Sequence, residues 1–352
     1  MSALRDLLLT RIAQTGPISI ASFMGDALMH PTHGYYATRD PFGAAGDFTT
    51  APEISQMFGE LIGLSLAQAW LDQGTPDPVI LAELGPGRGT LMEDILRATA
   101  SVPGFHDALT VHFIETSAHL RRMQAERVPQ AIWHDQIDSL PDAPLLLVAN
   151  EFFDALPIRQ FIRAGNGWRE RMVGAQDGQL CFGLSDAVPL AQLADRLADT
   201  KDGDLIETCP ALPGIISALV DRIARHGGAA LIIDYGDWQS LGDTLQALAG
   251  HAPADPLADP GAADLTAHVD FAAIAAHAAP ARHSRLTAQG VFLERLGITA
   301  RAQKLATRLT DAALEAHVAA HRRLTHPAEM GDLFKVMALY PATATPPPGL
   351  DP

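Results

Sequence analysis

The chain has 352 residues, enough for one large domain or for a core domain with sizeable insertions. Hydrophobic residues make up 47% and charged residues 19%, which excludes disorder throughout. The formal net charge of −16 argues against a general nucleic-acid binder, because affinity for a phosphate backbone rests largely on Lys and Arg. A basic protein partner remains compatible with this charge.

Cysteine content and hydropathy set the expected compartment. Two cysteines, Cys181 and Cys209, are too few for a disulfide framework or a four-thiolate metal site. We therefore expect a reduced protein in the cytoplasm of a bacterial cell. No apolar run approaches about 18 residues, so no membrane insertion is expected. The sequence does not predict the oligomeric state.

Residues 1–75 predict N-terminal helices around a glycine-containing loop. Apolar residues at helical spacing indicate a short amphipathic helix within residues 1–16. Two further helices are expected, at Ser19–Met29 and at Glu53–Asp72. The loop between them, Gly34–Pro52, has the length and glycine content of a lid over a site.

The region 76–340 alternates short apolar runs with helical patterns, which predicts an α/β fold with a parallel sheet. The expected core is a Rossmann-like, seven-stranded, mostly parallel, doubly wound sheet. Its predicted parallel strands are Val79–Leu84, Thr110–Glu115, Ile132–His134, Leu145–Asn150 and Ala230–Asp234. The predicted helices between them are Thr90–Ala100, Ser117–Glu126 and Gly214–His226.

Two insertions interrupt this alternation. Residues 155–205 predict a β-hairpin insertion, and residues 236–275 are Pro/Gly/Asp-rich and predict an irregular one. Helices near 291–296 and 310–323 and a strand at Leu333–Leu339 complete the core. We expect one domain with two insertions, followed by a frayed Pro-rich tail at 341–352.

The segment from Leu81 to Thr90 reads L-A-E-L-G-P-G-R-G-T at the turn from the first strand into its helix. Gly85, Gly87 and Gly89 allow a tight turn and a close approach of the backbone to a ligand. The helix that follows offers free N–H groups and a positive dipole end. The loop therefore predicts a ligand site.

Two ligand classes fit glycines after a strand. Dinucleotide binding needs G-x-G-x-x-G and an acid about 20 residues later, but Thr90 occupies the sixth position and Glu115 lies further on. Glu83 instead suits a ligand with a positively charged amino-acid end. Glu115 then suits ribose hydroxyls, unless it is only a solvated acid at a strand end. This pattern resembles motif I of class I S-adenosylmethionine (SAM) methyltransferases.

Further motifs narrow the resemblance. They are Gly34-Tyr-Tyr36, Gly46-Asp-Phe-Thr-Thr-Ala-Pro-Glu53, Phe58-Gly-Glu60, Asn150-Glu-Phe-Phe-Asp-Ala-Leu-Pro157, Ile233-Asp-Tyr-Gly236, Asp264-Leu-Thr-Ala-His-Val-Asp-Phe271 and Met330-Gly-Asp-Leu-Phe-Lys-Val336. In this order, from about Pro17 to Leu339, they resemble the MidA family. That family includes the mitochondrial NADH:ubiquinone oxidoreductase complex assembly factor 7.

This resemblance implies the fold of class I SAM methyltransferases, with SAM as the cofactor. It also implies a protein arginine methyltransferase that forms symmetric dimethylarginine and supports complex I assembly. The implied protein substrate is a respiratory complex I subunit of the 49-kDa type.

Arginine is a poor nucleophile because its guanidinium stays protonated, with a pKa above roughly 12. A site for it needs carboxylates that bind the guanidinium fork. Glu151 and Asp154 follow a parallel strand at the edge where open α/β sheets place ligands, so we predict both as catalytic. Asp154 has an alternative role, capping the turn before Pro157.

The remaining candidate residues fall into two groups. The candidate cofactor-binding residues are Glu83, Gly85, Gly87, Gly89, Glu115, Thr116, His134 and Asn150. The candidate substrate and lid residues are Gly46, Asp47, Phe48, Thr49, Glu53 and Tyr235. No metal site is expected, because His317 and His321 have helical spacing without the glutamate of a zinc motif.

Three alternatives from other classes stay open at this point. One is an assembly chaperone that keeps a SAM pocket without transferring methyl groups. The second is a small-molecule methyltransferase. The third is a nicotinamide-dependent dehydrogenase on the same fold.

Overall fold

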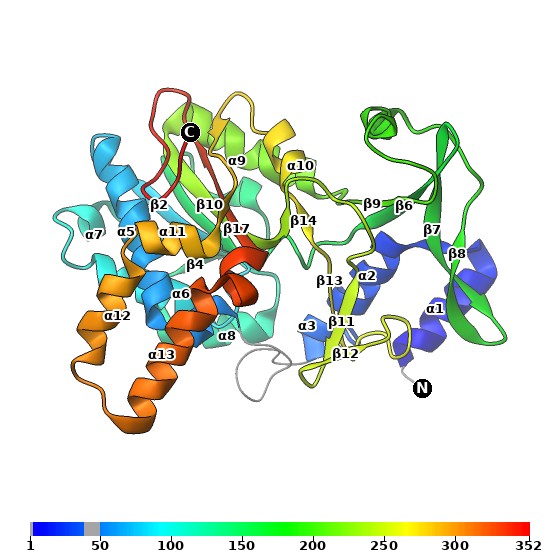
Figure 1. The fold of residues 1–352 in the computed structure, drawn as a ribbon, viewed down its shortest axis with the longest axis horizontal. Helices are drawn as coiled ribbons and strands as arrows, with labels where there is room; N and C mark the ends of the chain where they lie inside the picture. Colours follow the sequence, from blue (N-terminus) through cyan, green and yellow to red (C-terminus); the bar gives the residue numbers. More distant parts are fainter. Residues whose placement is uncertain (1–2, 39–49) are drawn as a thin grey trace. The chain divides into compact units, whose positions relative to one another are not determined.

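The computed structural model describes residues 3–38 and 50–352 (Figure 1). The chain forms two compact units. The insertion unit comprises residues 1–48, 154–212 and 239–270, and the sheet unit comprises 49–153, 213–238 and 271–352. The two predicted insertions thus group with the helices of residues 3–38, whereas residues 53–72, also predicted among the N-terminal helices, belong to the sheet unit. Within the described part of the chain, no helix is long and apolar enough to span a membrane.

The sheet unit contains a mostly parallel sheet. Its strands follow the order β15-β17-β10-β5-β2-β3-β4, with β16 also paired to β17. Their bounds are β2 Val79–Leu84, β3 Leu109–Ile114, β4 Ile132–His134, β5 Leu145–Asn150, β10 Gly228–Asp237, β15 Arg282–His283, β16 Thr287–Ala288 and β17 Phe334–Tyr340. The pairs from β4 to β10 are parallel, and β17 is antiparallel to β10. This order confirms the predicted α/β fold with a mostly parallel sheet. The described residues place nine strands in this sheet rather than the predicted seven, because short strands pair beside the seven of this path.

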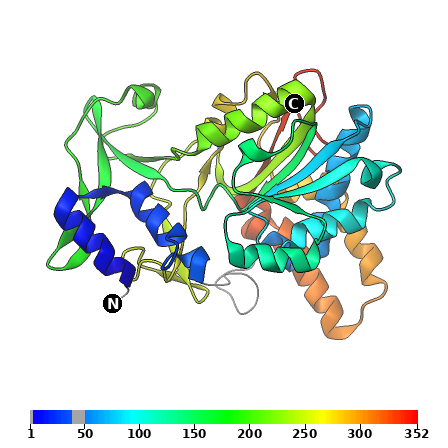
Figure 2. The same ribbon diagram turned by 180° about the vertical axis from the view of Figure 1, so that it is seen from behind.

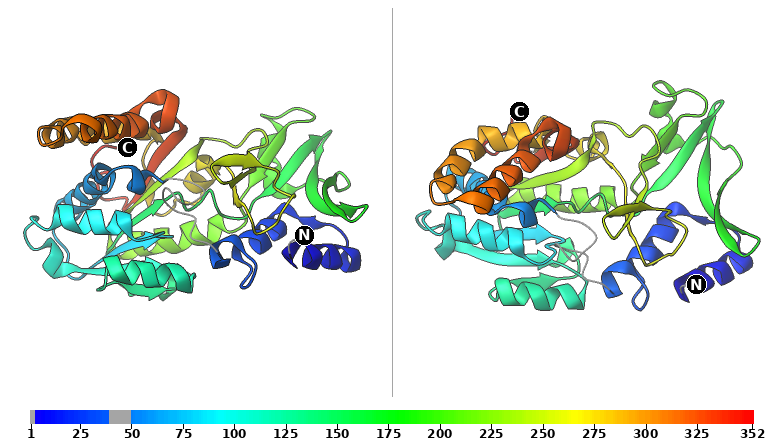
Figure 3. Two further views of the ribbon diagram at one scale, coloured as in Figure 1. Left: turned by 90° about the horizontal axis from the view of Figure 1, so that it is seen from below. Right: turned by 60° about the horizontal axis from the view of Figure 1, so that its bottom comes forward.

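Helices cover both faces of this sheet. Their bounds are α4 Ala51–Ile54, α5 Gln56–Asp72, α6 Thr90–Thr99, α7 Phe105–Ala108, α8 Ala118–Arg127, α9 Leu212–His226, α10 Phe271–Ala276, α11 Gln289–Arg295, α12 Ile298–Ala306 and α13 Asp311–Thr325. Figure 3 shows α11, α12 and α13 on the same side of the sheet as α5, and Figures 1 and 2 show α9 on the other side.

The predicted helix Glu53–Asp72 is two helices. Ser55 between α4 and α5 has an extended backbone, with φ −160° and ψ 134°, and its hydroxyl accepts a hydrogen bond from the N–H of Met57. Ser55 is therefore the N-cap of α5, and its extended backbone separates α5 from α4. The helix α12, between α11 and α13, was not predicted.

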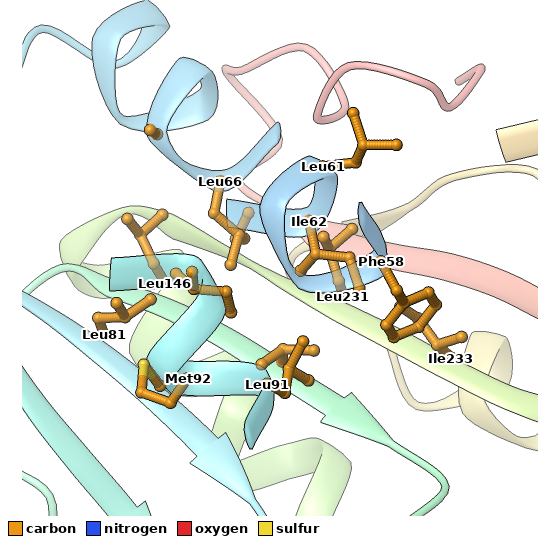
Figure 4. Close-up of a cluster of buried hydrophobic side chains, with 14 of the residues drawn as sticks. Phe58, Leu61, Ile62, Leu66, Leu81, Leu91, Met92, Leu146, Leu231 and Ile233 are labelled. Carbon is orange, nitrogen blue, oxygen red and sulfur yellow. The ribbon is translucent and has the colours of Figure 1, made fainter. Parts of the chain in front are cut away.

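The core of the sheet unit lies between α5, α6 and the sheet (Figure 4). Apolar side chains of both helices pack on alternate strand positions, as the two periodicities require. The labelled members are Phe58, Leu61, Ile62, Leu66, Leu81, Leu91, Met92, Leu146, Leu231 and Ile233. Buried Glu60 adds ion pairs to Arg97 of α6 and Arg301 of α12, which tie the three helices together.

The insertion unit has two small sheets and an apolar core of its own. Its elements are α1 Ala3–Thr15, β1 Ile18–Ser19, α2 Ile20–Met29, α3 Tyr35–Thr38, β6 Arg159–Ala164, β7 Gly167–Gln176, β8 Gln179–Leu184, β9 Leu205–Thr208, β11 Gln246–Ala249, β12 Ala252–Ala254, β13 Asp264–Thr266 and β14 Val269–Asp270. The antiparallel hairpin of the first insertion is confirmed. The second insertion is not simply irregular, because β11, β12 and β13 form an antiparallel sheet.

The Pro-rich tail is packed rather than frayed, so that prediction is wrong. Leu350 is buried in the core of the sheet unit. Ser65 of α5 donates to the carbonyl oxygen of Pro348, and Arg295 pairs with Asp351 at 2.9 Å. Prolines prevent a helix here, but an extended segment with one apolar anchor can still pack.

Candidate active site

The glycine loop lies between β2 and α6. Gly85, Gly87 and Gly89 all have positive φ, at 59°, 52° and 82°, where residues with a Cβ are strained. A Cβ on Gly85 would lie 3.0 Å from the Phe152 ring, so glycine is also needed there for space. The loop thus presents bare backbone at the carboxyl edge of the sheet, as the sequence predicted.

Glu83 is the last residue but one of β2, just before the glycine loop, and its side chain is buried. Burial raises the pKa of Glu83 to about 8, and a hydrogen bond from the backbone N–H of Met92 opposes this shift by less. The Oε2 atom has no hydrogen-bond partner among residues 3–38 and 50–352. A cationic ligand group would supply the missing donor, so this carboxylate fits the ammonium of a SAM amino-acid end.

Glu115 follows β3 and is 9% exposed, so it is not a solvated strand-end acid. Its Oε1 accepts from the N–H of Ser117 at 2.7 Å, and its Oε2 accepts from Gln124 at 3.2 Å. Burial raises the pKa of Glu115, against these donors. Thr116, the next residue, is exposed. A buried and oriented carboxylate at this strand end suits ribose hydroxyls.

His134, at the end of β4, has both ring nitrogens engaged. One nitrogen lies 2.8 Å from His112 and the other 2.8 Å from Ser139. Burial, and then the neighbouring His134, lowers the pKa of His112 to about 4. The backbone carbonyl of His134 accepts from the N–H of Glu115. Cofactor binding by the His134 side chain stays a prediction.

Asn150 is the last residue of β5, which ends beside β2, and Glu151 follows it. Glu151 has φ +50°, a conformation that non-glycine residues adopt rarely and that often marks a functional site. Its Oε1 accepts from the N–H of Ala51 at 3.1 Å and from the Asn150 amide at 3.0 Å. The Oδ1 of Asn150 is buried and finds no partner within the described residues. This second orphaned atom also points to a ligand at the strand ends.

Two predicted substrate residues also lie in the sheet unit. Glu53 accepts a hydrogen bond of 2.6 Å from the hydroxyl of Thr90, which begins α6, so α4 is tied to the glycine loop. Tyr235 is half-buried and packs edge to face on Phe334 at 5.3 Å. That contact gives Tyr235 a core role, and pocket lining stays a prediction.

Other predicted residues lie elsewhere. Asp154 is buried in the insertion unit, so its partnership with Glu151 is a prediction only. Gly46, Asp47, Phe48 and Thr49 lie outside the described residues.

Sequence reasoning missed several polar groups. In the insertion unit, the Tyr36 hydroxyl donates to Asp264 at 3.0 Å, and burial, then Asp264 and Asp154, raises the pKa of Tyr36. In the sheet unit, Gln124 and Trp133 form a hydrogen-bonded pair behind the glycine loop. The one sequence signal for Gln124 is its i,i+4 spacing from Leu120, which places an amide on the buried face of α8.

Among residues 3–38 and 50–352, no group of three or more His, Cys, Asp or Glu side chains is placed to hold a metal ion. His317 bonds the carbonyl oxygen of Ala302, and His321 bonds the hydroxyl of Thr299. Both histidines thus join α13 to α12.

Comparisons with known proteins agree with this geometry. A family model described as "Putative S-adenosyl-L-methionine-dependent methyltransferase" matches residues 61–290. The chain is 36% identical to the mitochondrial protein arginine methyltransferase NDUFAF7 homolog of Drosophila melanogaster, over 94% of this chain and 83% of that protein. It is 34% identical to mitochondrial NDUFAF7 of Homo sapiens, over 95% and 82%.

A solved structure extends the similarity to the bound ligand. A protein from Burkholderia thailandensis, crystallised with S-adenosyl-homocysteine, superposes with a TM-score of 0.81 at 30% identity, covering 99% of this chain and 93% of that one. A native crystal structure of a COG1565 superfamily protein from the same organism gives a TM-score of 0.80 at 31% identity, covering 99% of this chain and 92% of that one. The chain therefore belongs to the MidA family of S-adenosyl-L-methionine-dependent methyltransferases, and its methyl donor is SAM.

Proposed function

We propose that this methyltransferase acts on an arginine of a protein substrate. The further proposal is that the product is symmetric dimethylarginine on a respiratory complex I subunit of the 49-kDa type, in support of complex I assembly. The names of the relatives, protein arginine methyltransferases at 34–36% identity over nearly the whole chain, support the choice of arginine.

One structural observation carries the proposal. The Glu151 carboxylate stands at the carboxyl end of β5, and β5 pairs in parallel with β2, which leads into the glycine loop. The Glu151 backbone is held in a left-handed conformation, and two donors fix its Oε1. A carboxylate fixed in this way can bind the planar guanidinium fork.

When bound, SAM would supply an electrophilic methyl group attached to a sulfonium, and the sulfonium is a good leaving group because it departs as a neutral thioether. The residues of this chain position the nucleophile and exclude water. In this mechanism Glu151 holds the guanidinium and draws its positive charge away from the attacking nitrogen. The proton that the nitrogen loses then passes to this carboxylate.

Glu151→Gln tests the proposal in a methyl-transfer assay with an arginine-containing complex I peptide, read by mass spectrometry. We expect S-adenosylhomocysteine affinity to stay within about threefold and methyl transfer to fall about 100-fold, because the amide cannot balance the guanidinium charge. Glu93→Gln, at an exposed ion pair on α6, is the matched control and should keep full activity.

Two results would contradict the proposal. Full transfer by Glu151→Gln would remove the role of Glu151. Equal methylation of a peptide with lysine in place of arginine would remove the substrate assignment. Transfer to small molecules alone would favour the small-molecule alternative.

We also propose a cytoplasmic location, on the grounds of the two unpaired cysteines. The relatives are named as mitochondrial proteins. Fractionation of the source cells, with detection of the native chain, tests this location.

A further inference from the structure

Gln124 of α8 is completely buried and contacts three parts of the candidate site. Its Nε2 donates to the carbonyl oxygen of Gly87 at 2.8 Å and to Oε2 of Glu115 at 3.2 Å. Its Oε1 accepts from the indole N–H of Trp133 at 2.8 Å. One side chain therefore joins the glycine loop, the acid after β3 and the strand β4.

The chemistry of these partners fixes the orientation of the amide. An indole N–H can only donate, so the side-chain oxygen of Gln124 must face Trp133. The amide nitrogen then faces Gly87 and Glu115, which both offer acceptors, and each of its two hydrogens has a partner. A reversed amide would leave the Gly87 carbonyl, the Glu115 carboxylate oxygen and the Trp133 indole N–H without their partner, so Trp133 fixes the orientation.

The same contacts orient the Glu115 carboxylate. The N–H of Ser117 holds Oε1, and Gln124 holds Oε2, so the carboxylate cannot rotate without losing one donor. The backbone N–H of Thr116 also donates to this carboxylate, which leaves about one of its four lone-pair sites for a ligand hydroxyl. A carboxylate held in a fixed plane in this way suits a hydrogen bond from a ribose hydroxyl.

We propose that Gln124 is a positioning residue that sets Glu115 against the ribose hydroxyls of the methyl donor and couples it to the glycine loop. This inference rests on the assignment of Glu115 to the ribose. Glutamate at position 124 would face the Glu115 carboxylate with a second acceptor. An apolar side chain would leave the Gly87 carbonyl and Glu115 without their donor.

The test compares two ligands on two variants by calorimetry. The ligands are S-adenosylhomocysteine and its analogue without the ribose 2′-hydroxyl. For the native chain we expect the missing hydroxyl to weaken binding by about 10- to 100-fold, as for a hydrogen bond to a charged group. For Gln124→Met we expect the two ligand affinities to differ by less than about threefold, because the Glu115 carboxylate is no longer oriented by Gln124.

Gln289→Met is the matched control, because Gln289 is equally buried and its amide donates to the carbonyl oxygen of Leu324 instead. In this variant, removal of the ribose 2′-hydroxyl should weaken binding as much as in the native chain, since lost stability alone does not change the ratio of two ligand affinities. The same weakening in Gln124→Met would overturn the proposal.

Trp133→Phe decides the question if Gln124→Met does not fold, since it unlocks the amide and leaves Gln124 in place. A smaller effect of the missing hydroxyl on binding by this variant supports the proposal, and an unchanged effect overturns it. Failure of the native chain to transfer methyl groups to arginine would leave this result standing. Equal binding of the two ligands by the native chain would instead remove the ribose role of Glu115.

Discussion

The Glu83 side chain is buried, and it is also the group that we expect to bind a charged part of the ligand. A carboxylate that meets a ligand ammonium must be ionised, yet burial raises the pKa of Glu83 to about 8. Between pH 4.5 and about 8, the unfolded chain has lost this proton and the folded chain keeps it. The folded state therefore binds more protons, and stability falls as pH rises through this window.

Glu83→Gln is expected to raise stability and weaken cofactor binding. The amide keeps the acceptor for the Met92 N–H and has no charge to bury, so the variant should gain about 3 kcal/mol at pH 8 and much less at pH 5. Urea unfolding at the two pH values measures this gain. A variant less stable than the native chain at pH 8 would contradict the account.

The same residue sets the pH dependence of binding. Native affinity for S-adenosylhomocysteine should rise about fivefold between pH 7 and pH 8, as Glu83 ionises to meet the ammonium. The Glu83→Gln variant should bind S-adenosylhomocysteine more weakly, with an affinity that hardly changes between pH 7 and pH 8. Calorimetry at both pH values provides the comparison.

The sequence predicted the residues whose position follows from topology. Glu83, Glu115 and Glu151 each lie at or just after the end of a parallel strand, and parallel strands bring their carboxyl ends to one edge. Gln124 and Trp133 could not be placed in this way. Their contacts depend on which face of α8 packs behind the loop, and that is set by side-chain packing.

At the scale of elements, periodicity located helices and strands but not their breaks. Apolar spacing runs through Ser55, although its side chain caps α5 and splits the expected helix. The composition of the tail predicted fraying, because prolines exclude helix. It gave no information about Leu350, whose burial depends on a surface formed by distant elements.

Leu350→Ala is expected to destabilise the sheet unit by about 2 kcal/mol, through lost apolar burial and the cavity left behind. Leu333→Ala, at a site 47% exposed in the same unit, should cost less than about 0.5 kcal/mol. Urea unfolding of both variants measures the difference. Equal stabilities would mean that the tail does not pack in solution.

At the scale of the whole molecule, the chain interleaves its two units. The path leaves the sheet unit after Phe153, returns at Pro213, leaves again after Trp238 and returns at Phe271. The interruptions of the strand–helix alternation in the sequence predicted both insertions. Their grouping with α1, α2 and α3 was not predicted, because the shared apolar core that joins them is formed by contacts distant in sequence.

We conclude that the strand ends of the sheet unit form a methyl-donor site rather than a dinucleotide site. Titration calorimetry of the native chain with S-adenosylhomocysteine, and separately with NAD, tests it most directly. We expect micromolar binding of S-adenosylhomocysteine and no measurable binding of NAD. Preference for NAD, or no binding of S-adenosylhomocysteine, would contradict it.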